Sequence, residues 1–172
     1  GASVETEVKI EVAALDPIRD RLRALGARCL SVVDEDNQYF DRKGELAALD
    51  QSLRLRKDER VRLTWKGASA FRDGVVVRPE VEVTVSCFDD LAEILRHLGF
   101  RPAERLAKHR ETWALGGVEI ALDSLAFGHF VEIEGDRDAI DRVARGLGLD
   151  VGQGVGVSYR RLQRERRSAG SV

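Results

Sequence analysis

The sequence predicts an α+β fold in which about eight strands close or nearly close a small barrel, with helices packed on its apolar outer face. Three observations lead to this prediction. Charged and apolar residues alternate along most of the predicted strands, and charges of one sign are grouped on one strand. Three acidic strands each run into a helix that ends at a Leu-Gly pair. Because like charges repel on an open sheet, the charged face indicates the interior of a barrel.

Length and composition set the limits of this fold. The 172 residues, 43% hydrophobic and 34% charged, predict one globular domain over residues 1–167 and a disordered tail over residues 168–172. A net charge of −2 argues against nucleic acid as a partner. Only two cysteines are present, at no metal-ligand spacing, which favours a reducing, cytoplasmic setting. No segment reaches the roughly 20 apolar residues of a membrane span, so we expect no membrane partner.

The first strand is predicted over residues 4–12, where apolar and charged residues alternate strictly. Its charged face carries Glu5, Glu7, Lys9 and Glu11. A helix from about residue 17 to 25 should follow. Asp16 is expected to be its N-cap, Pro17 suits its first turn, and Gly26 should end it.

Seven more strands and three more helices complete the prediction. The strands are expected at residues 37–41, 52–57, 61–66, 75–85, 107–113, 118–123 and 130–134. The helices are expected at residues 88–98, 137–147 and from Ser158, as the N-cap, to about residue 167. Residues 67–74 are expected to be the most mobile loop.

The predicted inner face carries acids and bases in similar numbers. The acids are Glu5, Glu7, Glu11, Glu80, Glu82, Asp123, Glu132 and Glu134. The bases are Lys9, Arg54, Arg56, Arg62, Lys66, Arg78, Lys108 and Arg110. Carboxylates with no His or Cys cluster favour hard ions such as Mg²⁺, Mn²⁺ or Ca²⁺, and Arg and Lys suit phosphate oxygens. A metal-bound oligophosphate would satisfy both signs of charge.

The motif Glu5-Thr6-Glu7-Val8-Lys9 resembles the E-x-E-x-K signature of the CYTH superfamily, the triphosphate tunnel metalloenzymes. Further blocks resemble those of this family in order, so that the resemblance covers roughly residues 4–162. They are Gln38-Tyr39-Phe40-Asp41, Leu53-Arg54-Leu55-Arg56, Leu63-Thr64-Trp65-Lys66-Gly67, Arg78-x-Glu80-x-Glu82, Lys108-x-Arg110, Leu122-Asp123 and Gly128-x-Phe130-x-Glu132-Ile133-Glu134.

The resemblance implies an antiparallel eight-stranded barrel that forms a tunnel, and it implies roles for individual residues. The implied ligands of Mg²⁺ or Mn²⁺ are Glu5, Glu7, Glu132 and Glu134. The implied phosphate-binding residues are Lys9, Arg54, Arg56, Lys66, Arg78, Lys108 and Arg110. The catalytic candidates are Lys9, Lys66, Glu80 and Glu82, with the two glutamates binding a second metal or positioning water. The resemblance also suggests a homodimer.

Two positions depart from the family pattern. Asn37 stands where many members carry an acid, and Ser52 precedes the strand before which the animal thiamine triphosphatases carry a substrate-stacking Trp. Trp65 lies on the apolar side of its strand, where a core role is expected. Thiamine triphosphate is therefore a disfavoured substrate.

These observations support one leading function and two alternatives. The leading hypothesis is a metal-dependent triphosphatase that hydrolyses tripolyphosphate, ATP or another organic triphosphate. The first alternative is a class IV adenylyl cyclase, which would bind ATP with the same residues and release cyclic AMP and pyrophosphate. The second is a non-catalytic module that binds oligophosphates. The sequence does not separate them.

Overall fold

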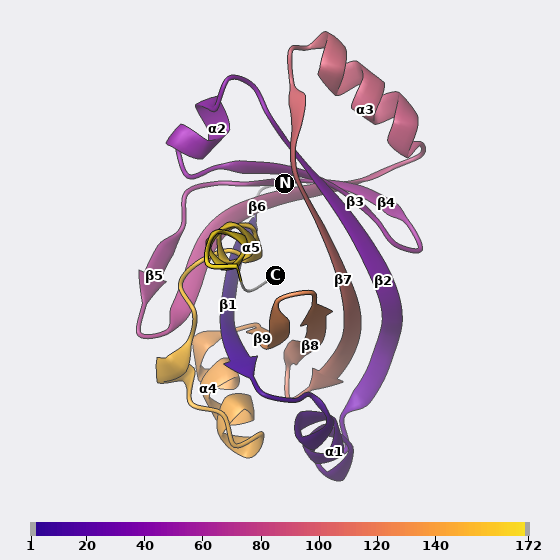
Figure 1. Ribbon diagram of the computed structural model, residues 1–172. Helices are drawn as coiled ribbons and strands as arrows, with labels where there is room; N and C mark the ends of the chain where they lie inside the picture. The colour runs from indigo at the N-terminus through magenta and orange to yellow at the C-terminus, as the bar shows by residue number, and fades with distance from the viewer. Residues whose placement is uncertain (1–2, 171–172) are drawn as a thin grey trace. The chain divides into compact units, whose positions relative to one another are not determined.

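The computed structural model describes residues 3–170 and shows nine strands and five α-helices (Figure 1). The strands are β1 (Ser3–Val12), β2 (Arg28–Asp41), β3 (Ser52–Lys57), β4 (Val61–Lys66), β5 (Ala70–Arg72), β6 (Val75–Val85), β7 (Arg101–Leu115), β8 (Val118–Leu125) and β9 (Gly128–Glu134). The helices are α1 (Asp16–Ala24), α2 (Glu45–Ala48), α3 (Phe88–His97), α4 (Arg137–Gly146) and α5 (Tyr159–Ser168), with a 3₁₀ turn at Val151–Gln153. No helix in residues 3–170 is long and apolar enough to cross a membrane.

The strands form one hydrogen-bonded sheet in the order β1-β9-β8-β7-β2-β3-β4-β6-β5. β1 also pairs with β6, so the order of eight strands closes on itself and β5 extends β6 alone. The β1–β9, β2–β3, β3–β4, β4–β6, β7–β8 and β8–β9 pairs are antiparallel. The predicted α+β antiparallel eight-stranded barrel is thereby confirmed.

The chain divides into two compact units. The β3–β4 unit comprises residues 3–4, 34–69 and 78–107, and the β8–β9 unit comprises residues 5–33, 70–77 and 108–170. The strands β1, β2, β6 and β7 contribute residues to both units.

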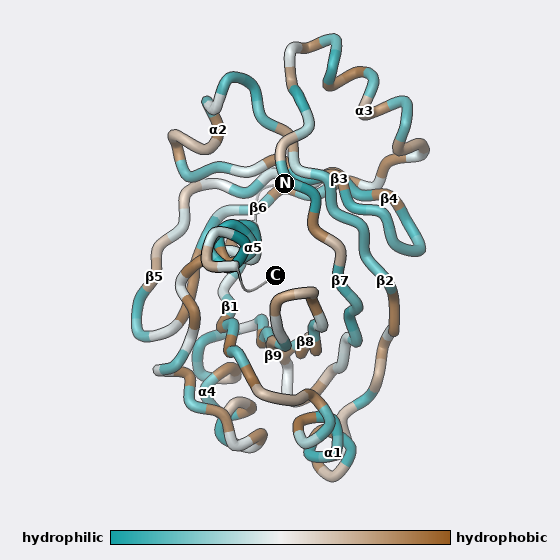
Figure 2. The backbone as a smooth tube through the Cα atoms, in the orientation of Figure 1, coloured by the Kyte–Doolittle hydropathy of each residue, from teal (hydrophilic) through white to brown (hydrophobic). Residues whose placement is uncertain are grey.

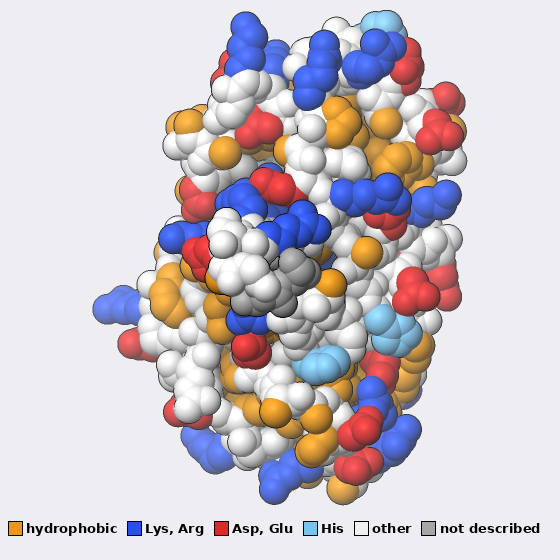
Figure 3. All heavy atoms as spheres, in the orientation of Figure 1, with side chains coloured by type: hydrophobic (Ala, Val, Ile, Leu, Met, Phe, Trp, Pro, Cys, Tyr) orange, Lys and Arg blue, Asp and Glu red, His pale blue; other side chains and the backbone are white. Residues whose placement is uncertain are grey.

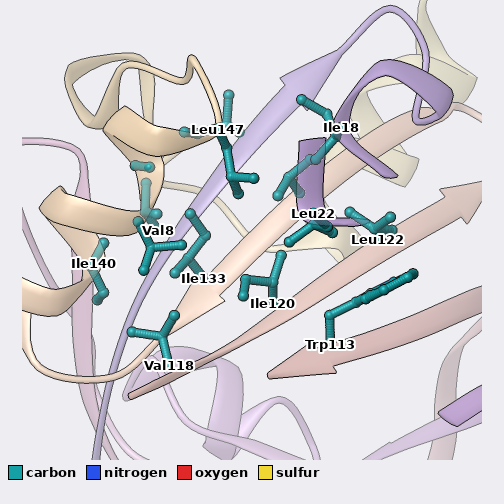
Figure 4. Packing of buried hydrophobic residues seen from close by; sticks show 14 of the residues in the cluster. Val8, Ile18, Leu22, Trp113, Val118, Ile120, Leu122, Ile133, Ile140 and Leu147 are labelled. Atoms are coloured by element: carbon teal, nitrogen blue, oxygen red, sulfur yellow. The ribbon is translucent and has the colours of Figure 1, made fainter. Parts of the chain in front are cut away.

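The core of the β8–β9 unit lies between the apolar faces of its strands and two helices. Val8 of β1, Ile120 of β8 and Ile133 of β9 are fully buried, and Figure 4 shows them together with Leu22 of α1 and Ile140 of α4. Burying one such side chain contributes about 1.5–3 kcal/mol. The apolar residues of the period-two pattern therefore pack against α1 and α4, as the sequence predicts for the outer face.

The β3–β4 unit has a smaller core. Phe40 of β2, Leu55 of β3 and Leu95 of α3 are buried there, and Leu63 of β4 and Phe88 pack against them. α3 thus covers the apolar faces of β2, β3 and β4, as α1 and α4 cover the apolar faces of the strands in the β8–β9 unit. On the solvent side, Figure 3 shows Lys and Arg side chains interspersed with Asp and Glu, a mixture typical of exposed surfaces.

Several elements differ from the sequence prediction. Leu15, not Asp16, is the N-cap of α1, and the Asp16 carboxylate forms an ion pair with Arg19 one turn later. β5 lies within the predicted loop 67–74 and forms a hairpin with β6. The turn of this hairpin is Asp73-Gly74, with positive φ at both residues, which is a strong hairpin sequence that the prediction missed.

The other boundaries are close to the predicted ones. β2 and β7 extend well before the predicted residues 37 and 107. Ser158 caps α5 as predicted, because its Oγ accepts a hydrogen bond of 3.2 Å from the Arg161 backbone N–H. Ser168 is the last residue of α5, and residues 171–172 of the expected disordered tail lie outside the described part of the chain.

One ion pair lies on the apolar side of the β8–β9 unit. Glu111 of β7 accepts hydrogen bonds from Arg19 Nε at 3.0 and 3.1 Å and from Trp113 Nε1 at 3.2 Å. The hydrogen bonds from Arg19 lower the pKa of Glu111, against the opposing effect of burial. The folded state therefore favours the ionised carboxylate at this position.

We expect Glu111→Gln to reduce the free energy of unfolding by about 1–3 kcal/mol at pH 7, the contribution typical of hydrogen bonds to a charged group. Because the folded-state pKa is lowered, this contribution is complete above the unfolded value of about 4.3 and disappears as the pH falls through the folded value. Urea unfolding monitored by Trp fluorescence between pH 3 and 7 tests this expectation. Glu165→Gln, at an exposed i,i+4 pair, is the control. If the difference in unfolding free energy between Glu111→Gln and the unmodified protein does not shrink at low pH, the expectation is contradicted.

Candidate functional site

Three glutamates gather at the start of β1 and the end of β9. One carboxylate oxygen from each of Glu5, Glu7 and Glu134 lies within 4.8 Å of the others. Glu7 and Glu134 are direct cross-strand partners, and Glu5 is two residues along β1 on the same face. Glu5 is only 7% exposed. Three negative charges so close repel one another unless a cation lies among them, and carboxylate oxygens are the ligands that Mg²⁺, Mn²⁺ and Ca²⁺ prefer.

The fourth predicted metal ligand has a different neighbour. Glu132 lies opposite Lys9 in the register of β1 and β9, one step away from the Glu7–Glu134 pair. Its carboxylate accepts a hydrogen bond of 2.5 Å from Arg110 Nη2. A role for Glu132 in metal binding stays a prediction.

Asp123 of β8 lies at the centre of the basic residues in the β8–β9 unit. Its side chain is fully buried and accepts hydrogen bonds from Arg110 Nε at 2.7 Å, Arg110 Nη2 at 2.6 Å, the Tyr159 hydroxyl at 2.7 Å and Lys108 Nζ at 3.4 Å. Burial alone would raise the pKa of Asp123, but the charges of Arg110 and Lys108 and these hydrogen bonds hold it below its usual range. Asp123 therefore stays ionised and orients both bases.

The helix α5 covers the charged face of the β8–β9 unit. Lys9 Nζ lies 4.1 Å and Lys108 Nζ 4.8 Å from the centre of the Tyr159 ring. Lys9 Nζ also donates a hydrogen bond of 3.1 Å to the Val157 carbonyl. Burial, followed by the charges of Glu132 and Asp123, raises the pKa of Tyr159, so its hydroxyl remains a donor. Figure 2 shows α5 as almost entirely hydrophilic, which fits a helix that contacts a charged face.

In the β3–β4 unit, the cross-strand register confirms that the predicted charged residues share one face. Arg54, Thr64 and Glu82 form one row across β3, β4 and β6, and Lys66 lies opposite Glu80 in the next row. Arg54 Nη2 donates to Thr64 Oγ1 at 3.3 Å, and that hydroxyl donates to Glu82 Oε1 at 2.7 Å. Thr64 is fully buried, whereas the Glu82 side chain is 34% exposed, so this row runs from the interior to solvent at Glu82.

Arg56 is held more tightly than Arg54. Its Nε donates a hydrogen bond of 2.7 Å to Asn37 Oδ1 and lies 3.2 Å from Glu35 Oε1. The side chains of Arg56 and Glu35 are 7% and 2% exposed. Asn37 therefore contacts Arg56, and Glu35 supplies the negative charge beside it. Arg56 has a structural role in addition to any role toward a ligand.

Arg78 contacts backbone rather than carboxylates. Its Nε donates to the Gly67 carbonyl at 2.9 Å and its Nη2 to the Asp50 carbonyl at 3.2 Å. These bonds attach the loop after β4 and the segment before β3 to β6. Arg78 is half-buried, and its predicted role toward phosphate stays a prediction.

The structure divides the predicted site residues between the two units. The β8–β9 unit brings together Glu5, Glu7, Lys9, Lys108, Arg110, Glu132 and Glu134. The β3–β4 unit brings together Arg54, Arg56, Lys66, Arg78, Glu80 and Glu82.

Sequence reasoning missed two residues of the β8–β9 unit. Glu119 lies directly opposite Glu134, and its even spacing from Asp123 along β8 could have placed it on the charged face. Tyr159 had no comparable signal, because it lies on a helix whose contact with the strands the alternation does not reveal.

Comparison with known proteins finds a matching family model and a related sequence. The family model described as the CYTH domain matches residues 3–149. A Methanocaldococcus jannaschii protein named "Putative adenylate cyclase MJ0240" is 26% identical over 136 residues, which is 76% of each chain.

Solved structures share the fold. The PH1012 protein from Pyrococcus horikoshii OT3 superposes with a TM-score of 0.78 and 25% identity, over 92% of this chain and 98% of that one. A Hippeastrum protein, HpAC1, superposes with a TM-score of 0.72 and 18% identity, over 94% of this chain and 95% of that one. The latter is described as a "putative adenylyl cyclase" that "reveals a dominant" triphosphatase activity.

Proposed function

Since the chain belongs to the CYTH domain family, we propose that it is a metal-dependent triphosphatase that hydrolyses a phosphoanhydride bond of tripolyphosphate or of an organic triphosphate. The observation that carries this proposal is the group of three carboxylates at Glu5, Glu7 and Glu134. Three carboxylates this close together attract a divalent cation, and the basic side chains of the same charged face attract an anion. A triphosphate complex of Mg²⁺ or Mn²⁺ supplies both.

The metal ion is assigned to Glu5, Glu7 and Glu134, with Glu132 as a further candidate ligand. The bound ion would neutralise part of the phosphate charge and make the phosphorus easier to attack. The chain's own contribution is to hold the carboxylates in place. Val8, between Glu7 and Lys9, is buried in the core, so β1 cannot rotate to release its charged face.

Phosphate binding is assigned to the basic side chains in each unit. These are Lys9, Lys108 and Arg110 in the β8–β9 unit and Arg54, Arg56, Lys66 and Arg78 in the β3–β4 unit. Arg110 is oriented by Asp123, and Arg54 by Thr64, so both guanidinium groups are held before a ligand binds. Groups fixed in advance stabilise developing charge without having to reorganise during the reaction.

The acidic residues of β6 are assigned the role of orienting the attacking water. Lys9 and Lys66 are assigned the role of stabilising charge on the transferred phosphoryl group. Glu82 accepts a hydrogen bond from Thr64 at Oε1, and its Oε2, which lies 3.9 Å from Arg62 Nη1, can also accept a hydrogen bond from water. Glu80 faces Lys66 across the strands. This pairing keeps a carboxylate and an ammonium group side by side on the reacting face.

A class IV adenylyl cyclase is the second candidate, and the name of the M. jannaschii relative favours it. There the 3′-hydroxyl of ATP attacks its own α-phosphorus and pyrophosphate leaves. The Hippeastrum protein supports the first candidate, because a dominant triphosphatase activity occurs on this same fold. A non-catalytic oligophosphate-binding module is the third candidate.

The experiment that separates these candidates is product analysis. The protein is incubated with Mg²⁺ or Mn²⁺ and either tripolyphosphate or ATP, and phosphate, pyrophosphate and cyclic AMP are resolved. The triphosphatase proposal expects equal amounts of phosphate and pyrophosphate from tripolyphosphate. Cyclic AMP with stoichiometric pyrophosphate as the main products from ATP would contradict it. Tight binding of tripolyphosphate with no turnover under either ion would favour the binding module.

A further inference from the structure

We propose that a cavity next to Glu134 binds the nucleoside part of a nucleoside triphosphate, with Arg28 and Glu119 as the residues that recognise it. This inference rests on the proposed function, since it names the class of organic triphosphate that the site takes. The cavity lies wholly within the β8–β9 unit.

The cavity has the size of a small-molecule site and adjoins the carboxylate group. Its volume is about 610 Å³, within the range of roughly 300–1,000 Å³ that is common for ligand pockets. Its lining includes Gly26, Arg28, Leu115, Gly117, Glu119 and Glu134. Because Glu134 belongs both to this lining and to the group of three carboxylates, a ligand in the cavity lies beside the proposed metal site.

The rim of the cavity leaves backbone groups accessible. Gly116 and Gly117 form the turn between β7 and β8, with φ values of 55° and 82°, a conformation that glycine adopts without strain. A Cβ atom added at Gly117 or at Gly26 would meet no atom within 4 Å. The rim is therefore open at both glycines, and a flat heterocycle can approach the main chain closely.

The charges of the lining select against phosphate and in favour of a neutral hydrogen-bonding group. Glu119 lies directly opposite Glu134, so two carboxylates face the cavity side by side and repel a phosphate. The same carboxylates accept hydrogen bonds from ribose hydroxyls or from an exocyclic amino group. The phosphates would then extend away from Glu119 toward the metal held at Glu134 and toward Lys9.

Arg28 supplies the complementary contact. Its guanidinium is planar, stacks on aromatic rings and donates to ring nitrogen or carbonyl acceptors. Arg28 and Glu119 are exposed, and neither forms an ion pair or side-chain hydrogen bond within residues 3–170, so both are available to a ligand.

The test compares binding of two ligands, one without and one with the organic part. Dissociation constants are measured by calorimetry with Mg²⁺ for tripolyphosphate and for an ATP analogue with a methylene group between its β and γ phosphorus atoms. We expect Arg28→Ala and Glu119→Ala each to weaken binding of the ATP analogue by about tenfold, the loss of one hydrogen bond to a charged group. Binding of tripolyphosphate should stay unchanged. The matched controls, Arg145→Ala and Glu59→Ala, change exposed charged residues outside the cavity lining and should alter neither ligand.

Three outcomes would overturn the inference. They are unchanged binding of the ATP analogue in both variants, an equal loss for both ligands, and no binding of the analogue to the unmodified protein. Failure of the proposed function gives a different result, because tripolyphosphate and the analogue would then bind as expected without any hydrolysis of tripolyphosphate.

Discussion

Replacing Glu7 with Gln is expected to reduce metal-dependent turnover of tripolyphosphate by about 100-fold or more, with the protein still folded. Gln has nearly the same shape as Glu but removes one of the three negative charges that Glu5, Glu7 and Glu134 bring together. The loss of charge weakens binding of a divalent cation, since hard cations depend on the number of anionic oxygens around them. Initial rates at increasing Mg²⁺ and Mn²⁺ concentrations measure the effect.

The control for this variant is Glu165→Gln, at an exposed position of α5. Both proteins should show the circular dichroism and urea midpoint of the unmodified chain, apart from a small gain in stability for Glu7→Gln if relief of repulsion dominates. Turnover of Glu7→Gln within threefold of normal would contradict a role in metal binding. Loss of the folded state would show instead that Glu7 is a structural residue.

Arg54→Ala is expected to raise the KM for tripolyphosphate by about 10- to 100-fold, because each hydrogen bond between an arginine and a phosphate contributes about 1.5–3 kcal/mol. Binding of the metal ion should change much less, since Arg54 contacts Thr64 and Glu82 and belongs to the other unit from the three carboxylates. Steady-state kinetics with tripolyphosphate as the varied substrate at saturating Mg²⁺ measure KM and kcat separately.

Arg60→Ala, in the exposed turn between β3 and β4, is the matched control for Arg54 and should leave KM unchanged. An unchanged KM in Arg54→Ala itself would place this side chain outside the substrate-binding site. Arg56 is less suitable for this test. Truncating it would leave Glu35, with a side chain only 2% exposed, without the guanidinium 3.2 Å away, and would reduce stability together with activity.

The alternation of charged and apolar residues was sufficient to locate most of the strands. β3, β4 and β6 begin and end at the predicted residues. Each of these strands is short or alternates uniformly, and each has polar turns at both ends. The early part of β2 was missed, since Leu30 and Val32 are exposed and do not alternate with charged residues. Pro102 obscured the start of β7, where a proline in a sequence normally argues against a strand.

The candidate site was predictable only in part. The E-x-E spacing shows which glutamates share a face, but the register between strands decides which of them meet. Glu134 lies opposite Glu7 and joins the group of three, whereas Glu132 lies opposite Lys9 and contacts Arg110. A single sequence does not contain this register, because shifting β9 by two residues would preserve the same alternation. Tyr159 depends on the tertiary position of α5, which strand periodicity does not describe.

The most direct test of the central claim is a crystal structure of the protein with Mn²⁺ and tripolyphosphate, with the metal located by its anomalous scattering. We predict an anomalous peak within coordination distance of carboxylate oxygens of Glu5, Glu7 and Glu134, with a phosphate oxygen completing its ligands. Tripolyphosphate bound in the crystal with Mn²⁺ elsewhere, or with no Mn²⁺ at these three carboxylates, would contradict the proposed metal site and the mechanism that depends on it.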